Sequence, residues 1–213
     1  MLSAQDTLNK ILNDEIVRDE DYLDFKFCTL NDINVIELMN KVNVNKIKEI
    51  FLSYTIFKEN SFNELLELIK LCTNLTKISF CNSYYKNISL VEVINSFSNL
   101  TKLEKITLNN FTLDNLTDIE INNISTCLSH LNNLKELYLC GNNLTDEKLN
   151  KLFETISLKN LTELCLNDNN LTEQSILLIL KKFPKLERLD IWKNNTEVNP
   201  RRPIKIITHY RYN

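Results

Sequence analysis

The stretch Leu134-Lys-Glu-Leu-Tyr-Leu-Cys-Gly-Asn-Asn-Leu144 decides the fold of this 213-residue chain. A second copy, Leu161-Thr-Glu-Leu-Cys-Leu-Asn-Asp-Asn-Asn-Leu171, has leucine at the same four positions and asparagine at the ninth. In the middle of both copies, leucine alternates with other residues at the period of a short strand that buries one face. Such internal repetition indicates a repeat architecture.

Looser copies of the motif lie on both sides of this pair. They begin at Ile47, Leu75, Leu103 and Leu186, and a degenerate copy begins near Glu20. Starting positions 47, 75, 103, 134, 161 and 186 are separated by 28, 28, 31, 27 and 25 residues. This spacing fits a repeat of about 20 to 29 residues with one insertion.

A helical segment follows each predicted strand. Ser61 and Ser89 each precede a Glu by three residues, which predicts a capping box at the helix start. Thr145 and Thr172 stand where an N-cap residue is needed. Apolar stripes at helical spacing follow these two threonines, and we expect them to face the strands: Leu149, Leu152, Phe153, Ile156, Ile176, Ile179, Leu180 and Phe183.

The motif resembles that of the ribonuclease-inhibitor-like, helix-containing leucine-rich repeat proteins over roughly residues 20–196. The resemblance implies an α/β class: a right-handed solenoid in a horseshoe arc, with the parallel sheet concave, the helices convex and about six to seven repeats. It also implies that the ninth residue bonds unpaired backbone in the turn. Three repeats keep asparagine there: Asn142, Asn169 and Asn194. The others carry Cys28, Thr55, Ser83 and Phe111. Hydroxyls can replace part of this bonding, whereas a phenylalanine cannot.

The chain divides into three parts. We predict an N-terminal helical cap over 1–19, repeats over 20–196 that start near 20, 47, 75, 103, 134, 161 and 186, and a C-terminal cap or tail over 197–213. The cap is predicted from a helical stripe of Leu8, Ile11, Leu12 and Ile16. The tail has strand composition over 204–212, which would cover the exposed edge of the sheet.

Composition indicates the compartment and excludes some partners. We identify neither a secretory signal nor an apolar run long enough to cross a membrane. The six cysteines lack any C-x-x-C pair, so we expect reduced thiols and a cytoplasmic location. The excess of Asn, Ile and Lys fits an AT-rich source, and the cytosol of a host cell is expected if that source is an intracellular parasite or virus. The net charge of −3 argues against nucleic acid and membrane surfaces.

The candidate binding residues follow from the register of the motif. Strand positions between the leucines should point outward on the concave face, and they include aromatic residues of the kind enriched in interface hot spots. We predict a partner-binding surface made of Phe51, Tyr54, Lys77, Lys105, Glu136, Tyr138, Glu163, Asp168, Asp190 and Trp192. Two alternatives remain open: the aromatic residues pack on their neighbours or a cap, and the charged residues only keep the face soluble.

Catalysis is not expected. His130 and His209 are the two histidines, and neither belongs to a nucleophile-base-acid set. Cys140 and Cys165 lie on adjacent predicted strands, but no histidine or acidic ligand at matching spacing supports a metal site. We therefore predict no catalytic residues, no metal and no cofactor.

These observations predict a monomeric module that binds a partner protein through its concave face. A regulatory or inhibitory subunit of an enzyme is the alternative, either nuclease-inhibitor-like or GTPase-regulating. A host-directed effector is a further alternative.

Overall fold

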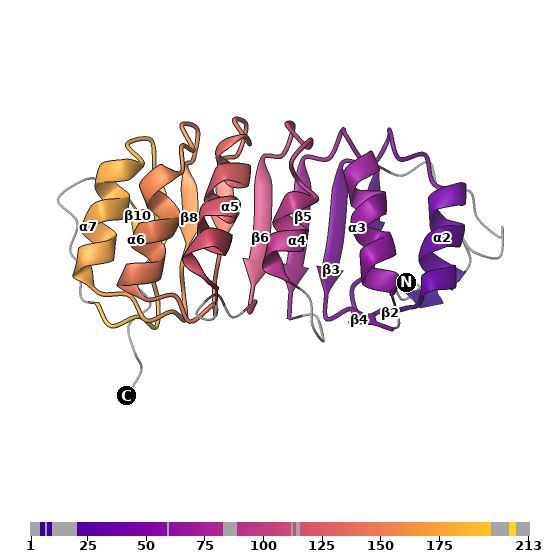
Figure 1. Cartoon of the computed structure of the whole chain (residues 1–213), viewed down its shortest axis with the longest axis horizontal. Helices are drawn as coiled ribbons and strands as arrows, with labels where there is room; N and C mark the ends of the chain where they lie inside the picture. Colours follow the sequence, from indigo (N-terminus) through magenta and orange to yellow (C-terminus); the bar gives the residue numbers. More distant parts are fainter. Residues whose placement is uncertain are drawn as a thin grey trace. The chain divides into compact units, whose positions relative to one another are not determined.

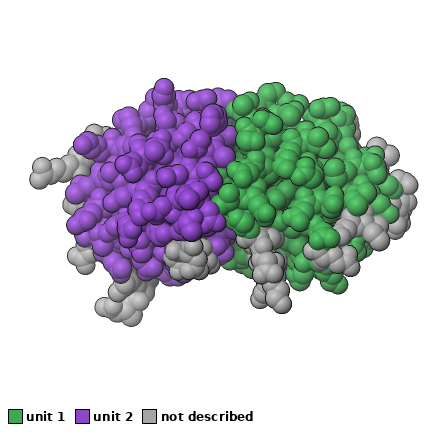
Figure 2. All heavy atoms as spheres, viewed as in Figure 1, with its two compact units in different colours: residues 1–103 green, residues 104–213 purple. Residues whose placement is uncertain are grey.

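The computed structural model describes residues 5–6, 8–9, 21–58, 60–82, 89–111, 113, 116–196 and 205–207. The chain forms two compact units, residues 1–103 and 104–213 (Figure 2). Among the described residues, none of the helices combines the length and the apolar character that crossing a membrane requires.

Unit 1 alternates strands and helices. Its main sheet consists of parallel strands in the order β1 (Tyr22–Asp24), β3 (Glu49–Ser53) and β5 (Lys77–Cys81). Two short strands pair beside it, β2 (Thr29–Leu30) and β4 (Ile56–Phe57). The helices are α2 (Asp32–Lys41), α3 (Ser61–Leu71) and α4 (Leu90–Asn95).

Unit 2 has the same alternation. Its parallel strands follow chain order: β6 (Lys105–Asn109), β7 (Glu136–Tyr138), β8 (Glu163–Cys165), β9 (Arg188–Asp190) and β10 (Lys205–Ile207). Helices α5 (Asp118–Ser129), α6 (Asp146–Thr155) and α7 (Glu173–Lys182) lie side by side (Figure 1). The predicted strand-turn-helix repeat is therefore confirmed. β10 pairs with β9, and the rest of the tail lies outside the described residues.

Leucine-type residues of the motif form the core of each unit. In unit 2, Ile106, Leu137, Leu164 and Leu189 are in register on neighbouring strands and have no exposed surface. The rings of Phe153 and Phe183 pack edge to face behind them, 5.1 Å between centroids. In unit 1, Phe80 packs between Phe62 and Phe97, each 6.3 Å away by ring centroid. The buried strand face therefore points at the helices, as the alternation predicts.

Three predicted N-cap residues are confirmed, but neither predicted capping box is complete, since Ser89 accepts from Val91 and not from Glu92. The hydroxyls of Ser89, Thr145 and Thr172 each accept a hydrogen bond from a backbone N–H of the first turn. The capping box predicted at Ser61 is wrong, because the N-cap residue of α3 is Asn60. Ser61 is buried, and its hydroxyl donates to the carbonyl of Leu30 in the preceding repeat, 3.2 Å away. A complete capping box joins Thr117 to Glu120, which the sequence analysis missed.

Buried asparagine side chains connect successive turns of unit 2. The Oδ1 atom of Asn169 accepts from the backbone N–H groups of Asn142 and Leu144, at 3.1 and 2.9 Å. Its Nδ2 atom donates to the carbonyls of Leu139 and Leu166, at 3.0 and 2.9 Å. Asn142 and Asn194 make equivalent bonds to their own preceding repeats. Each asparagine thus supplies partners to buried backbone groups that would otherwise lack them.

In unit 1, a threonine makes the donor half of these bonds. The hydroxyl of Thr55, which is fully buried, donates to the carbonyl of Phe25 at 2.9 Å, as the asparagine amide does in later repeats. Ser83 lies outside the described residues. Phe111 takes part through its backbone, since its N–H donates to Oδ1 of Asn142 at 2.6 Å.

Only part of the predicted N-terminal cap is described. Residues 5–6 and 8–9 are helical, and Leu8 is buried. Oε1 of Gln5 accepts from the backbone N–H of Thr29 at 2.9 Å, which ties this segment to the first repeat. Ile11, Leu12 and Ile16 lie outside the described residues.

Replacing one ladder asparagine should destabilise the fold. We expect Asn169→Ala to lower the free energy of unfolding by about 3 kcal/mol, because buried N–H and C=O groups lose their partners. The exposed neighbour provides the control: Asn170→Ala should change it by less than about 0.5 kcal/mol. Urea unfolding followed by circular dichroism measures both, and equal stability of the two variants would contradict the ladder.

Candidate functional site

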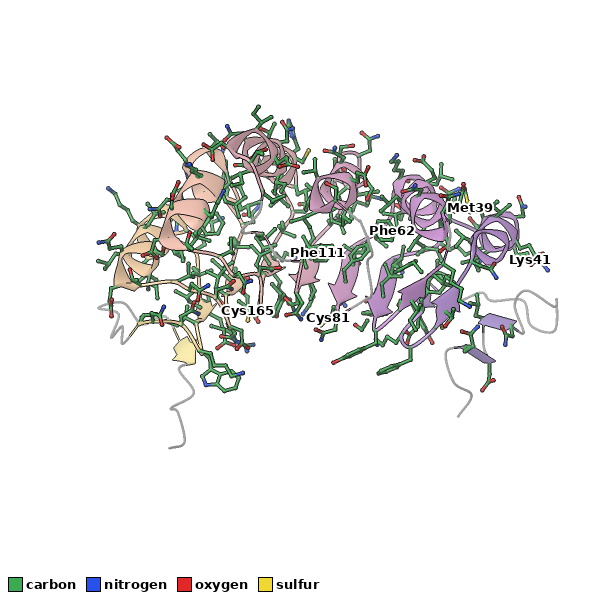
Figure 3. The ribbon with its side chains drawn as sticks, turned by 60° about the horizontal axis from the view of Figure 1, so that its bottom comes forward. Met39, Lys41, Phe62, Cys81, Phe111 and Cys165 are labelled. Atoms are coloured by element: carbon green, nitrogen blue, oxygen red, sulfur yellow. The ribbon has the colours of Figure 1, made fainter. Side chains whose placement is uncertain are left out.

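The face of the strands opposite the helices, called the open face here, carries most of the predicted binding residues. Along β7, Glu136 and Tyr138 are half-buried and flank the fully buried Leu137. In Figure 3, Cys165 lies on the strand side of the ribbon, away from the helices. The open face of unit 2 thus presents the side chains that the register predicts.

Tyr138 lies at the centre of a bonded group on this face. Its hydroxyl donates to Oε1 of Glu163 and lies 3.1 Å from Oε2 of Glu136. Nζ of Lys105 is 2.6 Å from the same Glu136 oxygen and 3.3 Å from the Tyr138 hydroxyl. The ammonium group also lies over the ring, 4.5 Å from its centroid, a cation-π contact.

Arg188 extends this group to the next strand. Its two terminal nitrogens lie 2.9 Å from Oε1 of Glu163 and 3.1 Å from Oδ2 of Asp190. We call the resulting set the Tyr138 network: Lys105, Glu136, Tyr138, Glu163, Arg188 and Asp190. It joins four consecutive strands, β6 to β9. Within the part of the chain that the structure describes, Nε of Arg188 and Oδ1 of Asp190 are buried without a hydrogen-bond partner.

The network changes the acid-base behaviour of Tyr138. Burial raises the pKa of its phenol far above the ordinary value, and the hydrogen bond to Glu163 raises the pKa further. The negative charges of Glu136 and Glu163 act in the same direction, since they oppose a third anion beside them. Tyr138 is therefore a neutral hydrogen-bond donor at any physiological pH.

Trp192 and its neighbours form a second group in unit 2. The indole is half-buried, and the Nζ atom of Lys193 lies 4.3 Å from a ring centroid. The same ammonium group is 3.0 Å from Oδ1 of Asp168. Oδ1 of Asn167 holds the Trp192 backbone by accepting its N–H at 2.6 Å.

The eighth residue of each repeat adopts the left-handed backbone conformation. Their φ angles run from 50° to 66° in seven successive repeats: Phe27, Tyr54, Asn82, Asn110, Gly141, Asp168 and Lys193. Glycine, asparagine and aspartate tolerate this region, whereas bulky side chains are strained in it. Phe27 and Tyr54 are therefore unusual at this position.

Phe27 and Tyr54 stack on each other at the ends of β1 and β3. Their ring centroids are 5.1 Å apart with planes 4° from parallel, yet the residues remain 73% and 49% exposed. Nδ2 of Asn82 lies 3.2 Å from the Tyr54 hydroxyl. An exposed aromatic pair on a strained backbone is a feature that function explains better than stability. The sequence analysis missed Phe27 because its repeat is degenerate.

The remaining predicted residues of unit 1 are paired locally. Nζ of Lys77 lies 2.6 Å from Oε1 of Glu49 on the adjacent strand. Phe51 is half-buried, and Nζ of Lys26 lies 4.4 Å from its ring centroid. Like Lys105 and Arg188 in unit 2, each of these cations lies beside an acidic or aromatic side chain of the same face.

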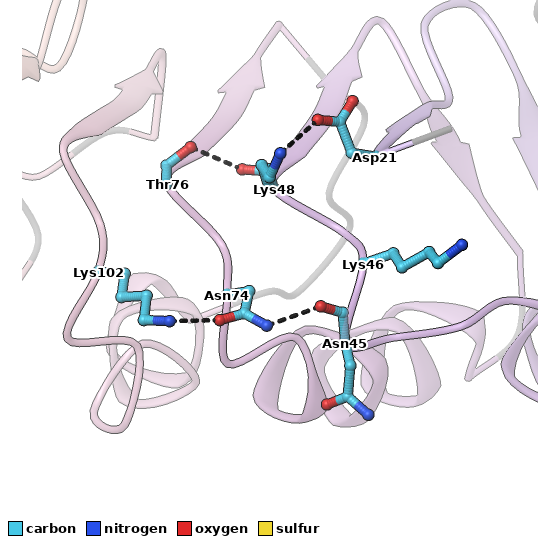
Figure 4. A pocket seen from close by; sticks show the side chains of 7 residues that line it. All are labelled: Asp21, Asn45, Lys46, Lys48, Asn74, Thr76 and Lys102. Carbon is cyan, nitrogen blue, oxygen red and sulfur yellow. Dashed lines mark hydrogen bonds and ion pairs between the residues drawn. The ribbon is translucent and has the colours of Figure 1, made fainter. Parts of the chain in front are cut away.

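A pocket of about 580 Å³ lies in unit 1 (Figure 4). Its lining residues are Asp21, Asn45, Lys46, Lys48, Asn74, Thr76 and Lys102. Nζ of Lys48 lies 2.9 Å from Oδ2 of Asp21 and lowers the pKa of that carboxyl. Lys102 donates to Oδ1 of Asn74, whose Nδ2 donates to the Asn45 carbonyl at 2.7 Å. Most of the polar groups of this pocket already bond one another.

Among the described residues, the histidine lies apart from the cysteines of the open face. His130 is the C-cap residue of α5, whereas the thiol of Cys165 lies on the open face. His209 lies outside the described residues. In the described part of the chain, no cluster of three or more His, Cys, Asp or Glu side chains is arranged to hold a metal ion.

Comparison of the sequence with models of known protein families gives no match, and no curated protein matches it. The structure resembles that of TLR13 in a TLR13–ssRNA13 complex, with a TM-score of 0.58 and 18% identity over 97% of this chain and 30% of that one. It also matches internalin C2 of Listeria monocytogenes, with a TM-score of 0.48 and 18% identity over 84% of this chain and 64% of that one. The chain has the leucine-rich repeat fold.

At this identity the likeness shows the fold alone. A second Listeria monocytogenes internalin, InlF, is 17% identical over 90% of this chain and 55% of its own, with a TM-score of 0.49. The leucine-rich repeat chain thus spans less than two thirds of each of these proteins.

The raised pKa of Tyr138 predicts a pH dependence. Below about pH 10, the ordinary tyrosine pKa, the unfolded and folded chains both hold the proton. Above it the unfolded chain ionises first, so the stabilisation from the network is lost as pH rises. We expect wild type to lose more unfolding free energy between pH 9 and about 11 than Tyr138→Phe does, measured by urea unfolding. Parallel losses would show that Tyr138 titrates normally.

We expect the fold to tolerate replacement of both strained aromatic residues, Phe27 and Tyr54. We expect Phe27→Asn/Tyr54→Asn to keep the unfolding free energy within about 1 kcal/mol of wild type, because relief of left-handed strain offsets the lost stacking. Phe27→Ala/Tyr54→Ala, which keeps part of the strain, should be the less stable of the two variants. Thermal unfolding compares both variants with wild type, and a large loss of stability in the asparagine variant would show that the stacked rings are mainly structural.

Proposed function

We propose that this chain is a non-enzymatic protein-interaction module that binds a partner protein through the open face of its sheet. The Tyr138 network carries the proposal. It places a tyrosine and an arginine, residue types enriched in interface hot spots, at the middle of a face that the described helices leave uncovered.

The network is rigid before any partner arrives. Tyr138 is bonded to the carboxylates of Glu136 and Glu163, and Arg188 bridges Glu163 to Asp190. Side chains fixed in this way lose little conformational entropy on binding, so more of the contact energy appears as affinity. Charges that served only to keep the face soluble would not need such bonding, since water satisfies them separately.

Charge favours a weakly cationic partner surface at this site. The network holds three carboxylates, Glu136, Glu163 and Asp190, against two cations, Lys105 and Arg188, which leaves one net negative charge. Such a surplus influences orientation and association rate more than affinity. In unit 2, we place Trp192 and Asp168 as further contacts beside the network. The corresponding face of unit 1 is proposed as a contact surface in its own right, with the Phe27–Tyr54 pair, Phe51 and Lys77.

Binding by variants of the open face tests the proposal. The partner is captured from lysate of the source cell on immobilised wild type, identified by mass spectrometry and purified. We then expect Tyr138→Ala and Trp192→Ala each to weaken binding by about tenfold or more in isothermal titration calorimetry, because each removes a large aromatic contact.

The matched control substitutes exposed apolar residues on helices of the same unit. Ile119 and Leu177 are 74% and 64% exposed on α5 and α7, so Ile119→Ala/Leu177→Ala should leave affinity unchanged. Circular dichroism confirms that every variant is folded. A partner that loses affinity for the helix variant and binds Tyr138→Ala normally would overturn the proposal.

A further inference from the structure

Two cysteine side chains meet on the open face of unit 2. Cys165 is the last residue of β8, and Cys140 follows the end of β7 by two residues. Their Sγ atoms are 2.8 Å apart. This separation exceeds the length of a disulfide bond, about 2.05 Å, by less than an ångström. The two sulfurs are therefore placed for covalent closure by a small movement.

The backbone holds the two residues in this position. The N–H of Leu139 donates to the Cys165 carbonyl at 2.8 Å, and that of Cys140 donates to Oδ1 of Asn109 at 2.9 Å. The register pairs Tyr138 with Cys165, so Cys140 lies diagonally across from Cys165. The two side chains already point toward each other, since their Sγ atoms are 2.8 Å apart despite the diagonal placement. Formation of the disulfide therefore requires only a further small approach of the two sulfurs.

The other thiols of the described chain have different surroundings. Burial raises the pKa of Cys28 to about 11 and that of Cys72 to about 12, which keeps both protonated and unreactive. Cys127 lies on helix α5, and Cys81 belongs to unit 1. Cys140 and Cys165 are thus distinguished by their geometry.

We propose that Cys140 and Cys165 form a redox-active dithiol that a hydroperoxide converts to a disulfide on the open face. The proposal is independent of whether that face binds a protein. Two successive displacements achieve the conversion, and the hydroperoxide is the oxidant in the first.

In the first step, the thiolate of one cysteine attacks the outer peroxide oxygen. An S–O bond forms, the O–O bond breaks, and the departing alkoxide or hydroxide takes up a proton to leave as alcohol or water. The product is a sulfenic acid. In the second step, the neighbouring sulfur attacks the sulfenic sulfur, the S–O bond breaks, and water leaves with the thiol proton. Two electrons have passed from the two sulfurs to the peroxide.

The pair also favours ionisation of one member. The two thiols share a hydrogen bond in which either sulfur can be the donor. This bond lowers the pKa of Cys165 and, together with burial, raises the pKa of Cys140. In the proposed sequence, Cys165 carries the first thiolate. Cys165 is 5% exposed, so a small oxidant such as hydrogen peroxide is the fitting probe. The half-buried Cys140 then acts as the resolving thiol.

The test uses the full chain, fully reduced and freed of reductant, treated with hydrogen peroxide. We expect the intact mass to fall by about 2 Da, as two hydrogens are lost. Peptide mapping without reduction should join the Cys140 and Cys165 peptides, and dithiothreitol should restore the original mass. Circular dichroism before and after treatment establishes that the chain stays folded.

Single substitutions separate the two roles. In Cys140→Ser the sulfenic acid on Cys165 cannot be resolved, so a dimedone adduct should accumulate at Cys165. Cys165→Ser should react about tenfold more slowly than wild type, and Cys127→Ser should close normally. A disulfide that joins other cysteines, or a folded wild type that gains oxygen without losing hydrogens, would overturn the proposal.

Discussion

The structure depends on the pairing of buried backbone groups in the turn that follows each strand. A repeat that turns from strand to helix leaves N–H and C=O groups inside the protein, where water cannot reach them. Asn142, Asn169 and Asn194 provide these groups with partners in the preceding repeat, and Asn169 and Asn194 also bond to their own. One side chain therefore completes the turn and also fixes the register between neighbouring repeats.

This constraint sets the geometry of the open face. Once the turns are fixed, the strands lie parallel in register, and side chains at equivalent positions stand beside one another. Residues from distant parts of the sequence can then bond, as Lys105, Tyr138 and Arg188 do through Glu136 and Glu163. The residue with left-handed backbone that follows each strand places its side chain beside the sheet. In two repeats these side chains are aromatic, and the rings of Phe27 and Tyr54 stack there.

Sequence reasoning predicted the repeat, its strands and helices, and the side chains of the open face, because leucine spacing alone determines which residues are buried. It predicted the threonine N-caps, because each depends on a single residue at the start of a helix. It did not predict the hydrogen bond of Ser61, which depends on the carbonyl of Leu30 in another repeat. It listed the charged residues of the face without their pairing, because pairing depends on cross-strand distances that no linear pattern contains. Phe27 was missed for a related reason: its repeat has Glu20 and Phe25 in place of two of the four leucines that define the register. The sulfur contact of Cys140 with Cys165 likewise required the side-chain directions, not only the adjacency of the strands.

The central claim is that the open face of unit 2 contacts a partner protein. Hydroxyl-radical footprinting of the chain with and without its captured partner tests it most directly, because aromatic side chains are readily oxidised and can be located by mass spectrometry. The account predicts that the partner protects Tyr138 and Trp192 while labelling of Ile119 and Leu177 on the helices is unchanged. Protection of the two helix residues, with Tyr138 and Trp192 labelled as in the free chain, would contradict it.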